Sequence, residues 1–193
     1  MRRGSRPRGP GADPIRHGSR GRRPKPGDKP WHLRPLRPGD EGKLIAFLQS
    51  HTPETIYQRY GYYSSGMSHE RAASLVGVDQ SRDCALGIFE AAAAGEILHA
   101  VGRYCLEPDG TAAEVAFVVR ESLRHLGMAT TLLEEMIRTA KARNLHLLWA
   151  VASATNTEMI SVLRSHHFNF GPPDAAGVVW GALILDGPRG QRR

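Results

Sequence analysis

The segment EVAFVVRESLRHLGMATTLLEEM, residues 114–136, joins a predicted strand to a predicted helix and decides the fold class. Apolar residues alternate along residues 112–120, with Val115, Phe117 and Val119 on one face, which is typical of a β-strand. After a polar turn, apolar residues recur at helical spacing and predict a long amphipathic helix. Its apolar face consists of Leu132, Leu133, Met136, Ile137 and Ala140. A buried strand that leads directly into such a helix indicates an α/β protein.

The first turn of this helix holds small residues where capping side chains and carboxylates usually lie. A helix start leaves about four backbone N–H groups without partners and carries a partial positive charge. Gly127 lets an anion approach the backbone closely, Arg124 adds a positive charge and Thr130 adds a hydroxyl. These residues predict a phosphate site, although they are equally compatible with an ordinary loop glycine before a good helix former. The segment is neither a Walker loop nor a Rossmann glycine motif.

The other segments predict further strands and helices around this unit. A strand near residue 32 leads into a helix capped by Asp40, and two short helices follow, the second capped by Ser68. Residues 84–91 and 96–105 predict a hairpin, residues 146–153 a strand, and a helix begins near Asn156. Residues 177–185 predict a closing strand. This order predicts an α/β fold with a mixed central β-sheet flanked by helices.

The charge of the chain is concentrated at its N-terminus. Residues 1–30 contain ten Lys and Arg against two Asp, a local charge of +8 within a total of +7, so the remainder carries about −1. We expect this Arg/Gly/Pro-rich tail to be disordered, because it has almost no large apolar side chains. It either stays solvated or docks on nucleic acid or an acidic partner. The predicted domain spans residues 31–186, and residues 187–193 form a short basic tail.

Hydropathy and cysteine usage restrict the class of protein further. No apolar run approaches the ~20 residues of a membrane span, and the N-terminus has no apolar leader segment. Cys84 and Cys105 lack the spacing of metal ligands. The sequence therefore predicts a cytoplasmic protein with reduced thiols, no membrane association and no metal.

The strand-turn-helix segment resembles the acetyl-coenzyme A loop of the GCN5-related N-acetyltransferase (GNAT) family, [Q/R]-x-x-G-x-[G/A]. Arg124, Gly127 and Ala129 match that pattern, and NTEMISVLRSHHF, from Asn156, is similar to the second helix of the family. The resemblance extends from about His32 to Leu185. Residues 32–60 and 68–90 are similar to the acetyltransferase domain of bacterial protein lysine acetyltransferases, with markers such as R-P-x-D-E and P-E-[ST]-x-Y-x-R-[YF].

The resemblance implies that acetyl-CoA is the co-substrate and assigns roles along the predicted loop. Backbone groups of Val118, Val119 and Arg120 would pair with the pantetheine arm, and Asn156 would reach the pantetheine amide or simply cap its helix. The pyrophosphate would be held by Arg124, His125, Leu126, Gly127, Met128, Ala129 and Thr130.

Glu114 is the predicted general base. A lysine amine has a free pKa of ~10.4, so presenting it neutral at pH 7 costs about 4 to 5 kcal/mol, which a proton acceptor offsets. Glu114 lies ten residues before Arg124, where many family members place a catalytic Glu. The alternative is a solvated charge at the strand edge. His125 and Glu121 are weaker candidates, because they lie in the loop assigned to the pyrophosphate.

Three positions depart from the family pattern. Leu163 stands where many relatives have a Tyr that protonates the departing thiolate, His167 replaces the usual Gly before Phe168, and Leu126 replaces a common phosphate contact. Aromatic and basic residues gather in the segment expected to border the acceptor groove, and they serve either acceptor recognition or core packing. These residues are Tyr57, Arg59, Tyr60, Tyr62 and Tyr63.

The sequence thus predicts an acetyl-CoA-dependent N-acetyltransferase that acetylates a primary amine, with a protein lysine as the preferred acceptor. Two alternatives remain open. The acceptor is a small-molecule amine, or the domain is a non-catalytic acyl-CoA-sensing module docked through its basic tail.

Overall fold

The computed structural model describes residues 30–60 and 68–185 of the 193-residue chain, with the side chains of residues 57–60 excepted. Predictions for the two tails and for the aromatic cluster from Tyr57 to Tyr63 therefore lie outside the described residues or side chains. Within the described ranges, no helix is long and apolar enough to cross a membrane, and no group of His, Cys, Asp or Glu side chains is arranged to hold a metal ion.

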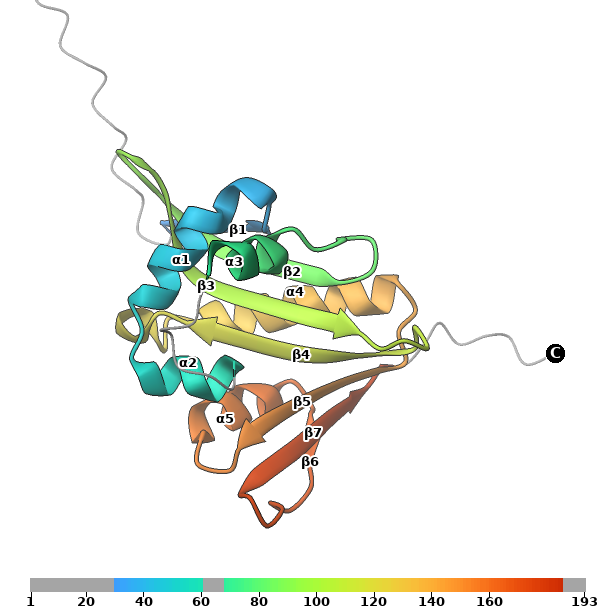
Figure 1. Ribbon diagram of the computed structural model, residues 1–193. Helices are drawn as coiled ribbons and strands as arrows, with labels where there is room; N and C mark the ends of the chain where they lie inside the picture. The colour runs from blue at the N-terminus through green and yellow to red at the C-terminus, as the bar shows by residue number, and fades with distance from the viewer. Residues whose placement is uncertain (1–29, 61–67, 186–193) are drawn as a thin grey trace, which may run out of the picture.

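In the described part of the chain, seven strands form one mixed sheet in the order β1-β2-β3-β4-β5-β7-β6, with helices packed against it (Figure 1). All neighbouring strands are antiparallel except β4 and β5, which run parallel. The strands are β1 (Trp31–Pro35), β2 (Cys84–Ala92), β3 (Gly95–Leu106), β4 (Ala112–Val119), β5 (Leu147–Ser153), β6 (Asn169–Phe170) and β7 (Val178–Ile184). The helices are α1 (Glu41–Gln49), α2 (Pro53–Tyr60), α3 (His69–Val76), α4 (Met128–Ala142) and α5 (Thr157–Ser165), with single 3-10 turns at Pro38–Asp40 and Glu121–Leu123.

Each face of the sheet has its own apolar core. On one face, Leu132, Leu133 and Met136 of α4 are fully buried against β2 to β5. On the other face, α1 and α3 cover β2 and β3, and Val118 of β4 packs there. Burying one such aliphatic side chain contributes about 1.5 to 3 kcal/mol. The alternation read from the sequence places Val115 and Phe117 in the α4 core and Val118 in the opposite core, so the predicted strand and its two faces are confirmed.

The parallel pair β4 and β5 stays together over a short length only. The two strands are paired at Ala112–Leu147, Ala113–Leu148 and Glu114–Trp149, and the pairing ends there. Beyond this point β4 continues beside β3, whereas β5 continues beside β7. The two halves of the sheet therefore part at Glu114, and a gap opens in the middle of the sheet.

The predicted order of elements is confirmed, with two corrections. Strand β6 was not predicted; its two residues pair with β7. The predicted role of Asp40 as the cap of α1 was wrong, because its carboxylate makes no capping bond to that helix. Ser68 does cap α3, since its hydroxyl accepts a hydrogen bond from the N–H of Arg71 at 3.2 Å.

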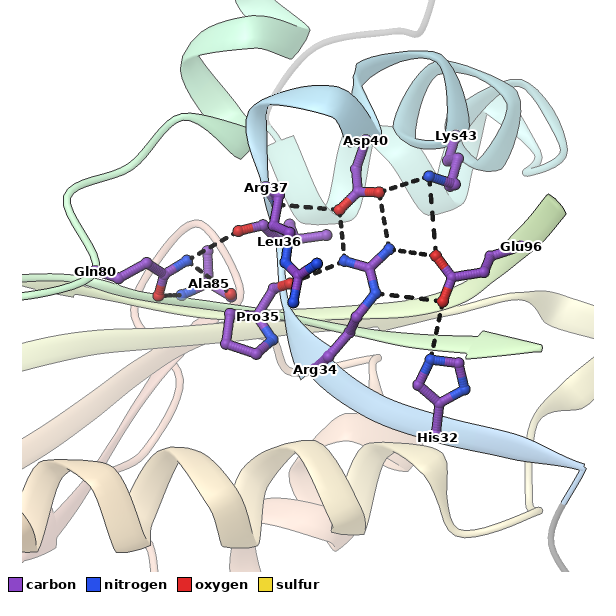
Figure 2. Close-up of polar contacts among 10 residues, drawn as sticks. All are labelled: His32, Arg34, Pro35, Leu36, Arg37, Asp40, Lys43, Gln80, Ala85 and Glu96. Atoms are coloured by element: carbon purple, nitrogen blue, oxygen red, sulfur yellow. Dashed lines mark hydrogen bonds and ion pairs between the residues drawn. The ribbon is translucent and has the colours of Figure 1, made fainter. Parts of the chain in front are cut away.

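Asp40 instead joins β1 to α1 through a buried ion-pair network (Figure 2). Its carboxylate accepts hydrogen bonds from the Arg34 guanidinium at 2.7 and 2.8 Å and from Lys43 at 2.7 Å. Glu96 binds the other side of the same guanidinium at 2.6 Å. Burial by itself would raise the pKa of Asp40, but these hydrogen bonds outweigh it and hold the pKa well below its usual range. The network fixes the N-terminal strand against the first helix.

Asp40→Asn is expected to lower the free energy of unfolding by about 3 kcal/mol, because it removes the more buried of the two carboxylates that pair with the Arg34 guanidinium and leaves only the partly exposed Glu96. Because the folded-state pKa of Asp40 is depressed, its contribution is present above the unfolded value of about 3.9 and is lost as the pH falls. Urea denaturation at pH 7 and pH 3 measures both effects. Glu96→Gln is the control, since Glu96 is more exposed and should cost about 1 kcal/mol or less. Equal losses for the two variants would contradict this reading.

Candidate active site

A cavity of about 680 Å³ lies where β4 and β5 separate, bounded by the loop after β4, the start of α4 and helix α5. Among its lining residues are Glu114 on β4, Val151 on β5 and Asn156 before α5. Ten of the twelve predicted site residues line it. The predicted site residues that line it are Glu114, Val118, Val119, Arg124, His125, Gly127, Met128, Ala129, Thr130 and Asn156. Arg120 and Leu126 are not among the lining residues.

The register of β3 and β4 decides which backbone groups face the gap. The Arg120 N–H donates to the His99 carbonyl at 2.9 Å, so these two residues form a hydrogen-bonded antiparallel pair. Because such pairs alternate along the ladder, Val118 and Ala116 also direct their backbone groups toward β3. The backbone groups of Phe117 and Val119 therefore point toward the gap, where β5 no longer pairs with β4. The sequence predicted that the backbone of Val118, Val119 and Arg120 pairs with the pantetheine arm. Of these three residues, only Val119 directs its backbone groups toward the gap by this register, and Phe117 does so as well.

The start of α4 leaves several N–H groups without partners. Gly127 has φ = +80°, a left-handed conformation that favours glycine, and an added Cβ would meet nothing within 4 Å. Gly127 makes no side-chain cap, and the first turn contains no acidic residue. The Thr131 N–H is the first to bond back, to the Gly127 carbonyl at 3.0 Å. This leaves the N–H groups of Met128, Ala129 and Thr130 available to an anion.

Arg124 and His125 meet an acidic residue of α5 at the mouth of the cavity. The Arg124 guanidinium lies 3.4 Å from the Glu158 carboxylate and donates to the Thr55 hydroxyl at 3.2 Å. His125 Nε2 lies 3.5 Å from the other Glu158 oxygen. The sequence reading missed Glu158, because an acid in the first turn of a helix is ordinary and carries no signal of a site. Glu158 thus engages the two side chains that an incoming phosphate would use.

Glu158→Gln is expected to tighten the binding of coenzyme A by about 3- to 10-fold. The substitution removes a negative charge that competes with phosphate for Arg124 and His125, and the gain is modest because all three side chains are partly exposed. Calorimetric titration at low and at physiological salt measures the change, which should shrink as salt screens the charges. Glu134→Gln on α4 is the control, because it removes an exposed carboxylate outside the cavity lining. Weaker binding by Glu158→Gln would contradict this assignment.

Glu121, which the sequence offered as a weaker candidate base, and His51, which it did not single out, shape the same region. The Glu121 carboxylate accepts hydrogen bonds from the Thr55 hydroxyl at 2.7 Å and from the Thr52 N–H and hydroxyl, which lowers its pKa to about 2. Glu121 is therefore a poor proton acceptor. His51 is buried, and its Nδ1 and Nε2 lie 2.7 Å from the Phe47 carbonyl and 3.3 Å from the Val119 carbonyl. Burial lowers the pKa of His51, which favours the neutral ring. Both residues position the end of β4.

The remaining predicted residues take different positions. Asn156 caps α5, since its side-chain oxygen accepts a hydrogen bond from the Met159 N–H at 3.2 Å while its side chain also borders the cavity. Met128 is buried in the core, so only its backbone is available to a ligand. Leu126 is 57% exposed and contributes no polar group. Leu163 is fully buried in the α4 core, so no proton donor stands at the position of the family Tyr.

Glu114 lies at the point where the two strands part. It is half-buried, borders the cavity and has Trp149 as its partner in the β4–β5 register. Across the β3–β4 ladder its neighbour is Cys105, which is exposed. Among the described residues, no hydrogen bond or ion pair engages its carboxylate, in contrast to Glu121 and Glu158. The site therefore combines a carboxylate without a competing partner, unpaired strand amides and an open helix start, which suits an extended ligand that ends in phosphates.

Known proteins with a similar sequence or fold are acetyltransferases. The sequence model of the acetyltransferase (GNAT) domain matches residues 31–169. The fold is similar to the GNAT domain of S. lividans PAT, with a TM-score of 0.70, 24% identity and coverage of 79% of this chain and 89% of that one. It is also similar to a ribosomal L7/L12 α-N-protein acetyltransferase in complex with coenzyme A (TM-score 0.66, 18% identity, 84% and 98% coverage). A third similar structure is the ribosomal-protein-S18-alanine N-acetyltransferase from Escherichia coli (TM-score 0.61, 18% identity, 84% and 98% coverage).

The family match covers most of the chain, and the structural matches show the same fold at low identity. The predicted fold, family and co-substrate are confirmed. The chain belongs to the GNAT acetyltransferase family and is an acetyl-CoA-dependent N-acetyltransferase.

Proposed function

We propose that this enzyme acetylates the side-chain amine of a protein lysine and that Glu114 is its general base. The observation that carries the proposal is the position of the Glu114 carboxylate. It lies beside the cavity where β4 and β5 part, and no described residue competes for it.

Different residues of the cavity would bind different parts of the coenzyme. The N–H groups of Met128, Ala129 and Thr130, with Arg124 and His125, would hold the pyrophosphate. The backbone of Phe117 and Val119 would pair with the amides of the pantetheine arm, and the Asn156 amide would contact it from α5. When bound, acetyl-CoA supplies a thioester whose carbonyl carbon reacts with an amine.

Glu114 performs the proton transfer that the acceptor requires. An ammonium group has no lone pair, and deprotonating a lysine at pH 7 costs about 4 to 5 kcal/mol in free solution. The Glu114 carboxylate accepts this proton directly or through one water. One of the N–H groups of Phe117 and Val119 stabilises the negative charge that develops on an acyl oxygen held in the gap, while the other pairs with the pantetheine arm. Because Leu163 is apolar, water rather than a side chain at that position protonates the leaving thiolate, whose free pKa is near ~8.5.

The preference for a protein lysine rests on resemblance. The segments around Asp40 and around Asp79 are similar to those of bacterial protein lysine acetyltransferases. The structures similar in fold include enzymes named for acetylating α-amines of ribosomal proteins, and both kinds of acceptor are primary amines on proteins. Lysine is therefore the acceptor we propose.

A screen of proteins, peptides and small amines with isotopically labelled acetyl-CoA tests the proposal, followed by mass spectrometry of the modified sites. The expected result is label on lysine side chains, reduced by about 100-fold or more when Glu114→Gln replaces the wild-type enzyme. Label confined to N-terminal α-amines or to small amines would contradict the choice of lysine. Coenzyme binding without label on any amine would instead favour an acyl-CoA-sensing module.

A further inference from the structure

The face of the sheet that carries Glu114 continues across β5 and β7 as an exposed apolar surface. Paired residues of these strands share a face, and the register brings Leu147 beside Ile184 and Val151 beside Trp180. Helix α5 packs on the opposite face, where Ile160 contacts Ala152 and Val179. Ile184 is consequently 77% exposed and Trp180 is 56% exposed.

Two tryptophans form the centre of this surface. Trp149 and Trp180 are stacked, with ring centroids 5.2 Å apart and an angle of 25° between the ring planes. The indole N–H of Trp149 donates to the Glu107 carboxylate at 3.2 Å, which fixes the inner ring. Trp180 is the outer ring of the pair and the more exposed one. A rigid, stacked pair with one open ring face is a preformed platform for a ligand group.

The platform lies next to the proposed catalytic carboxylate. Trp149 is the register partner of Glu114, and Trp180 pairs with Val151, which borders the cavity. Strands lie about 4.8 Å apart, and Trp180 lies two strands from β4 and two residues along β7 from the row of Glu114, so the two residues are roughly 10 to 12 Å apart across the sheet. That span corresponds to an extended peptide whose acceptor lysine enters at Glu114 and whose residue two or three positions away lies over Trp180.

The charges near the platform favour a cationic group. The faces of indole rings attract cations, and two carboxylates, Glu107 and Glu114, flank Trp149. Arg103 lies on the same face but is half-buried on β3, three strands from Trp180. An arginine or lysine side chain of an acceptor peptide would therefore find an aromatic face and negative charge at this position.

We propose that Trp180, supported by Trp149, forms a specificity subsite for a basic residue two or three positions from the acceptor lysine. A basic segment of the acceptor protein would therefore bind to the exposed face of β5 and β7 around Trp180. The inference rests on the proposed function, because it assumes that the acceptor is a lysine within a polypeptide.

Two peptides of equal length test the inference, each with one lysine and with either arginine or glutamine two residues away. The wild-type enzyme is expected to favour the arginine peptide by about 3- to 10-fold in kcat/KM, mainly through KM. Trp180→Ala and Trp180→Leu should abolish this preference, whereas Trp180→Phe should retain part of it. Ile184→Ala is the matched control, because it shortens an exposed apolar side chain on the same strand and face without removing an aromatic ring. Fluorescence anisotropy of labelled peptides should show the same order in direct binding.

An equal loss with both peptides, or the same loss in Ile184→Ala, would overturn the subsite. A wild-type enzyme that acetylates both peptides equally well would overturn it as well while leaving the proposed function intact. Failure of the wild type to acetylate any lysine would overturn the proposed function and this inference together. A second copy of the chain is the alternative occupant of this face, and sedimentation of the wild type and Trp180→Ala tests for it by measuring the oligomeric state. A dimer that the substitution dissociates, with no change in peptide preference, would show that a second copy covers this face.

Discussion

Glu114→Gln is expected to lower turnover by about 100-fold or more while leaving the affinity for acetyl-CoA largely unchanged. Glutamine keeps the size and most of the polarity of the side chain but cannot accept a proton from the acceptor amine. Since Glu114 forms no hydrogen bond or ion pair with the described residues, the substitution should not disturb the surrounding structure. Steady-state kinetics with a lysine acceptor, combined with calorimetric titration of coenzyme A, separate the two effects.

Two companion variants sharpen this test. Glu114→Asp keeps the carboxylate but withdraws it by one methylene group, so an intermediate loss of turnover is expected for a base that must reach the amine. Glu70→Gln removes an exposed carboxylate near the start of α3, where the chain has no contact with the cavity, and should have no effect. Full activity in Glu114→Gln would remove Glu114 from the base role and leave it as a solvated charge at the strand edge.

The second large effect is expected at Gly127. Gly127→Glu places a carboxylate at the helix start where the pyrophosphate would lie. Two negative charges about 4 Å apart at a protein surface repel by about 4 kcal/mol, which corresponds to a loss of affinity for acetyl-CoA of 100-fold or more. The left-handed backbone adds about 1 to 2 kcal/mol of strain for any side chain, although the added Cβ itself meets open space. Calorimetric titration measures the affinity, and a melting curve reports the strain.

Two control variants, Gly127→Ala and Gly110→Glu, separate the effect of the added charge from the effect of backbone strain. The alanine variant carries the strain without the charge and should retain most of the affinity. Gly110 lies in the β3–β4 turn with a similar φ of +73° and equally open surroundings, so its glutamate variant should be destabilised but bind normally. Tight binding of acetyl-CoA by Gly127→Glu would exclude this loop as the phosphate site.

The sequence was most informative where local rules act. The alternation of Val115 and Phe117 defined β4, and the glycine and small residues before Leu132 located the uncapped helix start. Both signals depend on neighbouring residues in the chain, so they can be read without the fold. The pattern of the loop also identified the family by resemblance, whereas the mixed sheet was predicted from the order of strands and helices along the chain.

What the sequence did not reveal depends on residues far apart in the chain. Asp40 was predicted as a helix cap, but the fold brings Arg34 and Lys43 to its carboxylate, and these charges determine its role. Glu158 faces Arg124 only because α5 packs beside the loop. Likewise, the Trp149–Trp180 pair arises from a strand register that hydropathy does not encode. Which amides of β4 face the gap also depended on the β3 register, a long-range property.

The interior gap of the sheet has a consequence for the handling of this protein. Phe117 and Val119 lie on a stretch of β4 that no strand pairs on the β5 side, and unpaired strand edges attract foreign strands during purification and storage. A ligand that pairs with this edge acts as the missing strand and binds only the folded chain. The coenzyme is therefore also a stabiliser: at 100 times its dissociation constant it would add about 2.7 kcal/mol to the apparent stability. Preparations kept with coenzyme should resist self-association and tolerate higher temperature.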